Sequence, residues 1–471
     1  MDGLAGSLRF FPLRQRRTSV VRGLPRLRKT PSITKSPLFH QAIPPDVVLG
    51  YGAGNIPGAA LLIAFLALST TLAGGRVPVV IVKNSRSEPI FSPLVFSGLE
   101  AVDPELVSMV AMLVWDYKDA YVQNFLTSHA DLVVAAASDE TIVHIQSQID
   151  LSNEEHERLT SRSIRFHAHG HKVSFSAIGR EMLAVEPTAA VEPTVAVETT
   201  AALRTTAAVQ STATVNSTDA VKSMEIRGLT EPANGQSMLD VVTLLAALDS
   251  IFWDQHGCLS SRIHFVEAGG DGYHTPLEYA MRLQEQLRWL ADFLPRGAWP
   301  LQQLHDRFDR YKHLEMTGDI QVISGYDDES LVILDQRRLR FSAFRGLIND
   351  CQGRVIVVRP VSDLMEIPEL YFKMLPPENL QSLSVAVGRP GEGLTDGFLH
   401  FAEACGACGV TAIRTIGRGA FPQLAYSWDG FLPLDLVRER PAGYFTTIEF
   451  DNPYEQILET YQILQVGKGG R

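Results

Sequence analysis

The chain has 471 residues, of which 45% are apolar and 20% charged, a composition typical of globular proteins. Its length allows two or three domains. The net charge of −11 argues against nucleic acid as a partner, because binding phosphates requires a basic surface. Four cysteines in so long a chain do not build a disulfide framework, so we expect a reducing compartment and a cytoplasmic location.

The first 45 residues differ in composition from the rest of the chain. Residues 1–36 contain nine arginines or lysines and one acidic residue, Asp2. No apolar run of secretory length follows them, so they are not a secretory signal. An arginine-rich, acid-poor start also fits an organellar transit peptide, but we favour a disordered basic tail.

Residues 46–183 alternate between short apolar runs and helical patterns. Strands are expected at 47–49, 79–82 and 131–136, and helices at 59–73, 92–100, 104–113 and 139–148. This alternation predicts crossover connections on a parallel sheet, the architecture of a Rossmann-type nucleotide domain. Residues 58–75 approach the length of a membrane span, but we interpret them as a helix buried under the sheet and expect no membrane span.

Three turns follow the predicted strands at their carboxyl ends, at residues 52–58, 83–86 and 137–140. Ligands of parallel sheets bind at that edge, so these turns predict a nucleotide site. The hydroxyl of Ser138 and the helix behind it suit a pyrophosphate, although a plain helix N-cap explains this serine equally well. The candidate cofactor residues in the turns are Gly54, Pro57, Lys83, Ser85, Arg86 and Ser138.

A six-residue repeat containing Ala-Val-Glu starts at Ala184. It has no aromatic residue and cannot form a core, so residues 184–227 are expected to be a disordered insertion. Residues 228–440 predict a second α/β domain, and 441–471 a C-terminal segment. The elements expected in that domain are helices at 237–253, 276–293 and 397–408 and strands at 262–267, 354–358 and 383–387.

Cys258 is the strongest candidate for a catalytic residue. It follows Gly257 at a turn after an apolar helical run. A cysteine nucleophile can take the acyl group of a thioester, provided that a cation or a helix terminus lowers the thiol pKa from about 8.5. The alternative suggested by composition is a buried structural cysteine.

Two other groups of residues fit known site patterns less well. His167, His169 and His171 alternate, so a strand would place them on one face, where they could bind a metal. No acid or cysteine stands nearby, and we predict no metal site. Cys405 and Cys408 form an isolated Cys-x-x-Cys, which fits small residues at a helix end better than a redox pair or a zinc site.

In their order along the chain, the motifs resemble those of the long-chain acyl-CoA reductases of the Lux type, within the aldehyde dehydrogenase superfamily. The segments that carry the resemblance are 54–58 (Gly-Asn-Ile-Pro-Gly), 82–89, 138–141, 170–175, 254–260 (Asp-Gln-His-Gly-Cys-Leu-Ser), 354–387 and 428–430. The resemblance implies a Rossmann-type cofactor domain joined to an α/β catalytic domain. Relatives have a longer region ahead of the first motif, and the basic start and the repeat of this chain are foreign to them.

The resemblance also implies roles for individual residues. Cys258 becomes the nucleophile, and the amide of Asn55 with the backbone N–H of Cys258 forms an oxyanion hole. Asp350 lies near the position from which relatives contact the nicotinamide ribose. Arg86 stands where NAD-preferring relatives often carry glutamate, which favours NADPH. Ala168 occupies the slot of a glutamate that activates the hydrolytic water in many relatives, which favours reduction over acid formation.

The expected function is NADPH-dependent reduction of a long-chain fatty acyl-CoA, or of an acyl-protein thioester, to the fatty aldehyde through a Cys258 acyl-enzyme. Three alternatives stay open: a short-chain CoA-acylating aldehyde dehydrogenase, a catalytically silent remnant, and a cysteine acyltransferase or thioesterase that needs no nucleotide. The partners to consider are acyl-transferase or synthetase subunits and a second copy of the chain, and nucleic acid is not expected.

Overall fold

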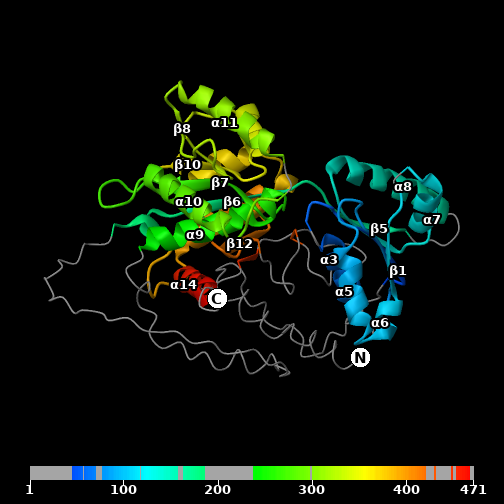
Figure 1. The fold of residues 1–471 in the computed structure, drawn as a ribbon. Coiled ribbons are helices and arrows are strands. Elements are labelled where there is room, and N and C mark those ends of the chain that lie inside the picture. Colours follow the sequence, from blue (N-terminus) through cyan, green and yellow to red (C-terminus); the bar gives the residue numbers. More distant parts are fainter. Residues whose placement is uncertain are drawn as a thin grey trace, which may run out of the picture.

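A computed structural model describes residues 45–56, 58–69, 77–116, 118–157, 163–185, 237–297, 300–420, 429–430, 447–448 and 452–466. The basic N-terminal tail, nearly all of the six-residue repeat and Pro57 lie outside these residues. The described chain forms two lobes, each built around one β-sheet (Figure 1).

The first lobe is a parallel sheet of five strands in the order β3-β2-β1-β4-β5. Its strands are β1 (Val47–Tyr51), β2 (Val79–Lys83), β3 (Val110–Leu113), β4 (Leu132–Ala136) and β5 (Arg165–His169). Its helices are α3 (Ala59–Ser69), α5 (Phe91–Glu100), α6 (Pro104–Ser108), α7 (Ala120–Ser128) and α8 (Asp139–Glu157). The central strand β1 is apolar on both faces because helices cover both sides of the sheet. This confirms the predicted α/β class with a parallel sheet.

One predicted helix of this lobe is wrong in its second half. Residues 104–113 were expected to be helical throughout, but α6 ends at Ser108 and β3 begins at Val110. The run Val-Ala-Met-Leu is too short for its periodicity to separate a strand from a helix, and pairing with β2 decides in favour of the strand. The sequence also gave no expectation for α7, whose first turn is capped by Asp119.

The second lobe is a sheet of eight strands in the order β13-β12-β11-β6-β7-β10-β9-β8, parallel except for β8. Its strands are β6 (Val173–Ile178), β7 (Ser261–Glu267), β8 (Ile320–Val322), β9 (Leu331–Asp335), β10 (Val355–Val361), β11 (Leu380–Ala386), β12 (Ala412–Thr415) and β13 (Thr447–Ile448). Helices α9 (Met238–Ile251), α10 (Pro276–Ala291) and α14 (Pro453–Val466) pack on one face. Helices α11 (Leu301–Glu315), α12 (Phe341–Asp350) and α13 (Asp396–Cys408) pack on the other.

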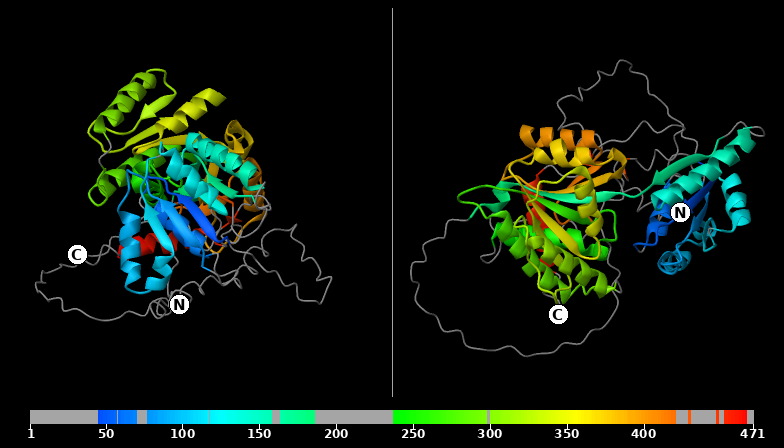
Figure 2. Two further views of the ribbon diagram at one scale, coloured as in Figure 1. Left: turned by 90° about the vertical axis from the view of Figure 1, so that its right-hand side faces the viewer. Right: turned by 90° about the horizontal axis from the view of Figure 1, so that it is seen from above.

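The chain crosses from the first sheet to the second at residues 170–172, between β5 and β6. The crossing precedes the domain boundary that the sequence predicted at residue 183, because β6 is already a central strand of the second sheet. Figure 1 and the right-hand view of Figure 2 show the two lobes side by side, joined through this crossing. The turns that follow β1, β2 and β4 lie at the carboxyl edge of the first sheet, and Cys258 lies just before β7, at the amino edge of the second.

No helix within the described part of the chain is long and apolar enough to cross a membrane. The apolar stretch that begins at Gly58 forms α3, which ends at Ser69. Its residues Ile63, Ala64 and Ala67 are fully buried in the core that α3 shares with the sheet. The interpretation of this stretch as a buried helix is therefore confirmed over residues 59–69.

Gly409 at the end of α13 and Gly346 inside α12 provide a matched test of the fold. Gly409 ends α13 with φ of 117°, and a Cβ there would overlap the carbonyl oxygen of Pro377. Gly346 lies inside α12, where a Cβ would meet no atom within 4 Å. We expect Gly409→Ala to lower the free energy of unfolding by at least ~2 kcal/mol and Gly346→Ala to raise it by about 0.5–1 kcal/mol. Urea unfolding of the full chain measures both, and equal effects would contradict the described helix ends.

Candidate active site

The segment that leads to Cys258 has an unusual backbone. Trp253, Asp254 and Gln255 have φ of 56°, 50° and 61°, in the left-handed region that residues other than glycine rarely adopt. Each such residue costs about 1–2 kcal/mol, so the surroundings must hold the segment in this shape. The apolar helix α9 stops here, and the chain turns sharply before β7.

Arg354 supplies the main contacts that hold this segment. Its Nε donates to Asp254 Oδ1 at 2.5 Å and its Nη2 to the Leu294 carbonyl at 2.7 Å. The Arg354 side chain is 4% exposed. The backbone N–H groups of Gly353 and Gly297 also donate to Asp254, at 3.0 and 2.9 Å. The turn before the cysteine is therefore anchored to the amino end of β10.

Cys258 itself is half-buried, and its carbonyl accepts a hydrogen bond from Ser174 Oγ at 2.7 Å. Burial, aided by the nearby carboxylate of Asp429, raises the pKa of the Cys258 thiol to about 11. A hydrogen bond from the Gln381 side chain and the charge of Lys172 oppose this rise. The lowered pKa that we expected for a nucleophile is thus not present in the free protein, because burial outweighs the nearby cation.

A buried polar network lies beside the thiol. His169 Nδ1 lies 2.7 Å from Asp429 Oδ2, and their side chains are 5% and 2% exposed. Gln381 Nε2 donates to the other oxygen of Asp429 at 2.5 Å. Burial raises the pKa of the Asp429 carboxyl, but the hydrogen bond and charge of His169, with Lys172 and Gln381, outweigh it and hold that pKa below its usual range.

Asn55 joins the two lobes at the cysteine turn. Its Nδ2 donates to the backbone carbonyl of His256 at 2.6 Å, two residues before Cys258. A Cβ at Gly257 would lie 3.7 Å from the side chain of Ile56, so the two turns lie against each other. The structure therefore brings together the two segments on which the sequence prediction depends, although they are about two hundred residues apart.

The predicted cofactor turns lie against one another at the carboxyl edge of the first sheet. A Cβ at Gly54 would overlap the hydroxyls of Ser85 and Ser87, so only glycine allows the two turns to approach this closely. Ser87 Oγ donates to the Gly54 carbonyl at 3.1 Å. The backbone N–H of Gly52 donates to the carbonyl of Lys83 at 3.0 Å.

Two cations, Lys83 and Arg86, stand at this edge. Lys83 Nζ lies 5.5 Å from the centre of the Trp115 ring. Burial, with the nearby charge of Arg86, lowers the pKa of Lys83. Arg86 Nη2 pairs with Asp116 Oδ2 at 2.8 Å, and both side chains are exposed. A bound anion at this edge would compete with Asp116 for Arg86.

The remaining predicted residues have identifiable partners. Ser138 Oγ accepts a hydrogen bond from the backbone N–H of Thr141 at 3.4 Å, which is the N-cap arrangement. Asp350 is held by Arg310 Nη2 at 2.7 Å and by the Tyr311 hydroxyl at 2.8 Å. These contacts direct its carboxylate toward α11.

The alternating histidines and the Cys-x-x-Cys pair lie in two different parts of the fold. His167 and His169 are buried on β5, whereas His171 lies beyond the end of that strand. Within the described ranges, no group of three His, Cys, Asp or Glu side chains could hold a metal ion. Cys405 is buried near the end of α13, and Cys408 Sγ donates to the Pro368 carbonyl at 3.3 Å.

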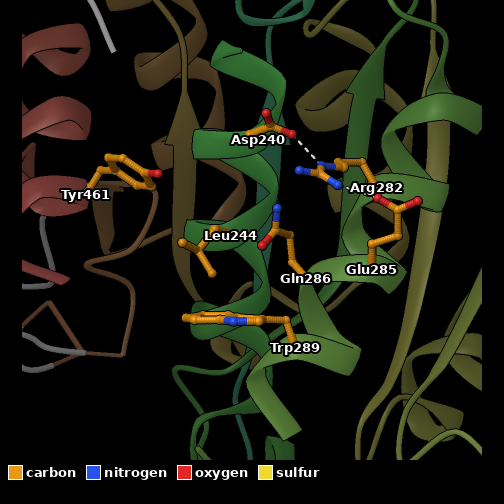
Figure 3. A pocket seen from close by; sticks show the side chains of 7 residues that line it. All are labelled: Asp240, Leu244, Arg282, Glu285, Gln286, Trp289 and Tyr461. Atoms are coloured by element: carbon orange, nitrogen blue, oxygen red, sulfur yellow. Dashed lines mark hydrogen bonds and ion pairs between the residues drawn. The ribbon is translucent and has the colours of Figure 1, made fainter. Parts of the chain in front are cut away.

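Two hollows of the second lobe lie away from the residues predicted from sequence. One of about 250 Å³ is lined by residues of α9, α10 and α14 and contains the ion pair of Asp240 and Arg282 (Figure 3). The other, of about 380 Å³, lies at the carboxyl ends of β6, β7, β10 and β11. Cys258 is at the amino edge of the same sheet, so neither hollow belongs to the cysteine site.

The sequence analysis missed Gln381 and the partnership of His169 with Asp429. Asp429 lies in the segment 428–430 that carried part of the resemblance, but nothing in its spacing pointed to His169, 260 residues earlier. Gln381 is a polar residue near the start of an apolar strand, a weak signal in a sequence read alone.

The sequence model of the acyl-CoA reductase family LuxC matches residues 26–204 and 222–439. The chain belongs to the LuxC family. The matched ranges include the Gly54–Gly58 turn, the Cys258 turn and Asp429. We found no curated protein with a matching sequence.

Solved structures with a similar arrangement are aldehyde dehydrogenases. The Δ-pyrroline-5-carboxylate dehydrogenase from Mycobacterium tuberculosis is 12% identical, with a TM-score of 0.48, over 84% of this LuxC-family chain and 63% of its own. The NAD-dependent benzaldehyde dehydrogenase from Corynebacterium glutamicum is 12% identical, with a TM-score of 0.45, over 80% and 65%. The salicylaldehyde dehydrogenase from Pseudomonas putida G7 is 11% identical, with a TM-score of 0.48, over 80% and 62%. The chain spans less than two thirds of the length of each.

The ion pair of the buried Arg354 with the partly buried Asp254 can be tested by substitution. Arg354→Ala leaves the Asp254 carboxylate without its cation and frees the left-handed turn, so we expect a loss of about 3 kcal/mol in the free energy of unfolding. Lys312→Ala removes one partner of the exposed pair with Glu315 and is expected to cost no more than ~0.5 kcal/mol. Urea unfolding compares the two variants, and similar costs would show that Arg354 does not hold the turn.

Proposed function

We propose that this LuxC-family chain reduces a long-chain fatty acyl-CoA, or an acyl-protein thioester, to the fatty aldehyde with NADPH, through an acyl-enzyme on Cys258. The observation that carries the proposal is the docking of the Cys258 turn against the glycine-rich turn of the first lobe through Asn55. This contact lies beside the carboxyl edge of the parallel sheet, where ligands of such sheets generally bind. The family match agrees with this chemistry, and we propose a cytoplasmic location, where thiols stay reduced.

In the proposed acylation, the Cys258 sulfur attacks the thioester carbonyl. A bond forms between sulfur and the acyl carbon, the S–H bond and the bond from the acyl carbon to the CoA sulfur break, and CoA leaves as a thiol. A pKa of about 11 keeps the resting residue protonated near neutral pH. Acylation therefore requires a group that accepts the thiol proton as the sulfur attacks.

Asn55 is suited to stabilise the oxyanion that forms on the acyl oxygen. Its amide nitrogen carries two hydrogens, and the hydrogen bond to the His256 carbonyl uses one of them. That bond also fixes the amide relative to the cysteine turn. An oxyanion-hole donor that is positioned in advance contributes roughly 3–4 kcal/mol to the stability of the transition state.

The first lobe fits a phosphorylated dinucleotide. The close approach at Gly54 brings the turns after β1 and β2 together, and Lys83, Ser85 and Arg86 would hold the adenosine ribose with its phosphate. The N-terminus of α8 with Ser138 would face the pyrophosphate. When bound, NADPH would supply the hydride that reduces the acyl group. Ala168 offers no carboxylate to activate water, which supports reduction over hydrolysis.

Cys258→Ala tests the nucleophile. We expect no NADPH oxidation at 340 nm with a long-chain acyl-CoA, because the acyl-enzyme cannot form, while NADPH binding followed by fluorescence is unchanged. Cys408→Ala is the matched control, since Cys408 is also half-buried but lies on α13, and it should keep full activity. Turnover by Cys258→Ala with release of CoA would end this mechanism. In the unmodified protein, faster turnover of short than of long acyl chains would instead favour a CoA-acylating dehydrogenase.

Arg86→Gln tests the choice of cofactor. A charged hydrogen bond to a ribose phosphate is worth about 1.5–3 kcal/mol, so its loss should lower the ratio of kcat/KM for NADPH over NADH by roughly ten- to a hundredfold. Arg389→Gln removes an equal charge from an exposed loop after β11 and serves as the control. An unchanged ratio in the Arg86 variant would mean that this arginine serves only its pair with Asp116.

A further inference from the structure

Four separate segments converge on the Cys258 side chain. His169 comes from the end of β5 in the first lobe, and Lys172 from the crossing between the lobes. Gln381 comes from the start of β11, and Asp429 from the short described segment 429–430. A hydrogen bond links His169 to Asp429, a second links Asp429 to Gln381, and Gln381 in turn hydrogen-bonds the thiol.

The pair of His169 and Asp429 is built into the interior. Both side chains are almost fully buried, and Asp429 adopts φ of 49°, a left-handed conformation that its surroundings must maintain. A buried carboxylate is costly unless it is paired and hydrogen-bonded. Here both carboxylate oxygens have partners, one on the imidazole and one on the Gln381 amide.

We propose that His169 and Asp429 are positioning residues for Cys258: they hold the Gln381 amide against the sulfur, and the Asp429 carboxylate, hydrogen-bonded by the His169 imidazole, sets how readily the thiol gives up its proton. The proposal rests on the proposed function only in taking Cys258 as the nucleophile. It gives the histidine of β5, next to Ala168, a role in the reactivity of the cysteine. It also makes that reactivity depend on the contact between the two lobes.

The physical argument is electrostatic. The carboxylate of Asp429 opposes a second negative charge on the sulfur, and the imidazole of His169 offsets that carboxylate. Two cations also face the thiol, Lys172 from the crossing and Arg262 from β7. Lys172 Nζ donates to the Glu378 carbonyl at 2.8 Å, and Arg262 Nη1 donates to the Ile348 carbonyl at 3.2 Å.

Removing the carboxylate should therefore act in the direction opposite to removing the imidazole that is hydrogen-bonded to it. Asp429→Asn keeps the shape of the side chain but removes the negative charge, so the thiolate forms more readily. His169→Gln leaves the Asp429 carboxylate without its imidazole, so the thiolate forms less readily. A role in packing alone would predict that both variants change the reactivity of the thiol in the same direction.

The test is the rate at which iodoacetamide alkylates Cys258 between pH 6.5 and 10, followed by mass spectrometry of the peptide that contains it. A shift of one unit in the thiol pKa changes the alkylation rate below that pKa by only about threefold, because a less basic thiolate is also a weaker nucleophile. We expect alkylation at pH 7.5 to be at least ~3-fold faster than in the unmodified protein for Asp429→Asn, and slower for His169→Gln. Cys408 in the same samples is the internal control and should react at one rate throughout.

An unchanged Cys258 profile in Asp429→Asn, or a change of the same sign in both variants, would overturn the proposal. The fully buried Cys351 and Cys405 report on folding, because their alkylation reveals an opened structure. If either variant opens the fold, Gln381→Ala replaces it in the same assay. Loss of the amide donor should slow alkylation of Cys258, and an unchanged alkylation rate would overturn the proposal. The assay needs no turnover, so a failure to reduce acyl-CoA would refute the proposed function and leave this result standing.

Discussion

The left-handed turn at Trp253–Gln255 is the constraint on which the arrangement of the site depends. Three successive residues hold an unfavourable backbone conformation, and the pair of Asp254 and Arg354 maintains it. Since Arg354 precedes β10 and Cys258 precedes β7, the pair ties the cysteine to the amino edge of a rigid eight-stranded sheet. A flexible loop at this place would give the thiol no fixed position relative to the first lobe.

The carboxyl edge of the first sheet faces the amino edge of the second. Polar turns at the carboxyl ends of β1, β2 and β4 provide glycine, hydroxyl groups and cations, which are the groups that a phosphorylated ligand needs. The amino edge of the second sheet provides a thiol, an amide and a paired carboxylate. Asn55 and His169 of the first lobe form hydrogen bonds with the second.

The high proton affinity of Cys258 has a structural cause and a chemical consequence. Burial disfavours the thiolate, and the carboxylate of Asp429 adds to the effect, so the resting protein carries a thiol of low reactivity. Such a thiol resists oxidation and alkylation. The cations Lys172 and Arg262 and the Gln381 amide are already in place to stabilise negative charge once the proton leaves.

Several features could be predicted from the sequence because they depend on local patterns. Short runs of three to six residues between polar turns identified six strands, three in each sheet (β1, β2, β4, β7, β10 and β11), and Gly409 marked the end of α13 through its need for a left-handed conformation. The order of short motifs, from Gly54 to Asp429, was enough to suggest the family. Residues 110–113 were misread as helix because a short apolar run has no decisive period, and only its pairing with β2 makes it a strand.

The tertiary structure alone decided which polar groups meet at the cysteine. Partnerships such as that of His169 with Asp429 join residues hundreds of positions apart, and spacing in a sequence carries no information about such contacts. The raised pKa of the Cys258 thiol could not be predicted from the sequence either, because a pKa depends on burial and on neighbours brought close by folding. The sequence by itself determined the two parallel layers and the candidate nucleophile, since period and composition encode burial. The tertiary structure determined which contacts hold the candidate nucleophile in place and what raises its pKa, since both depend on residues far apart in the sequence.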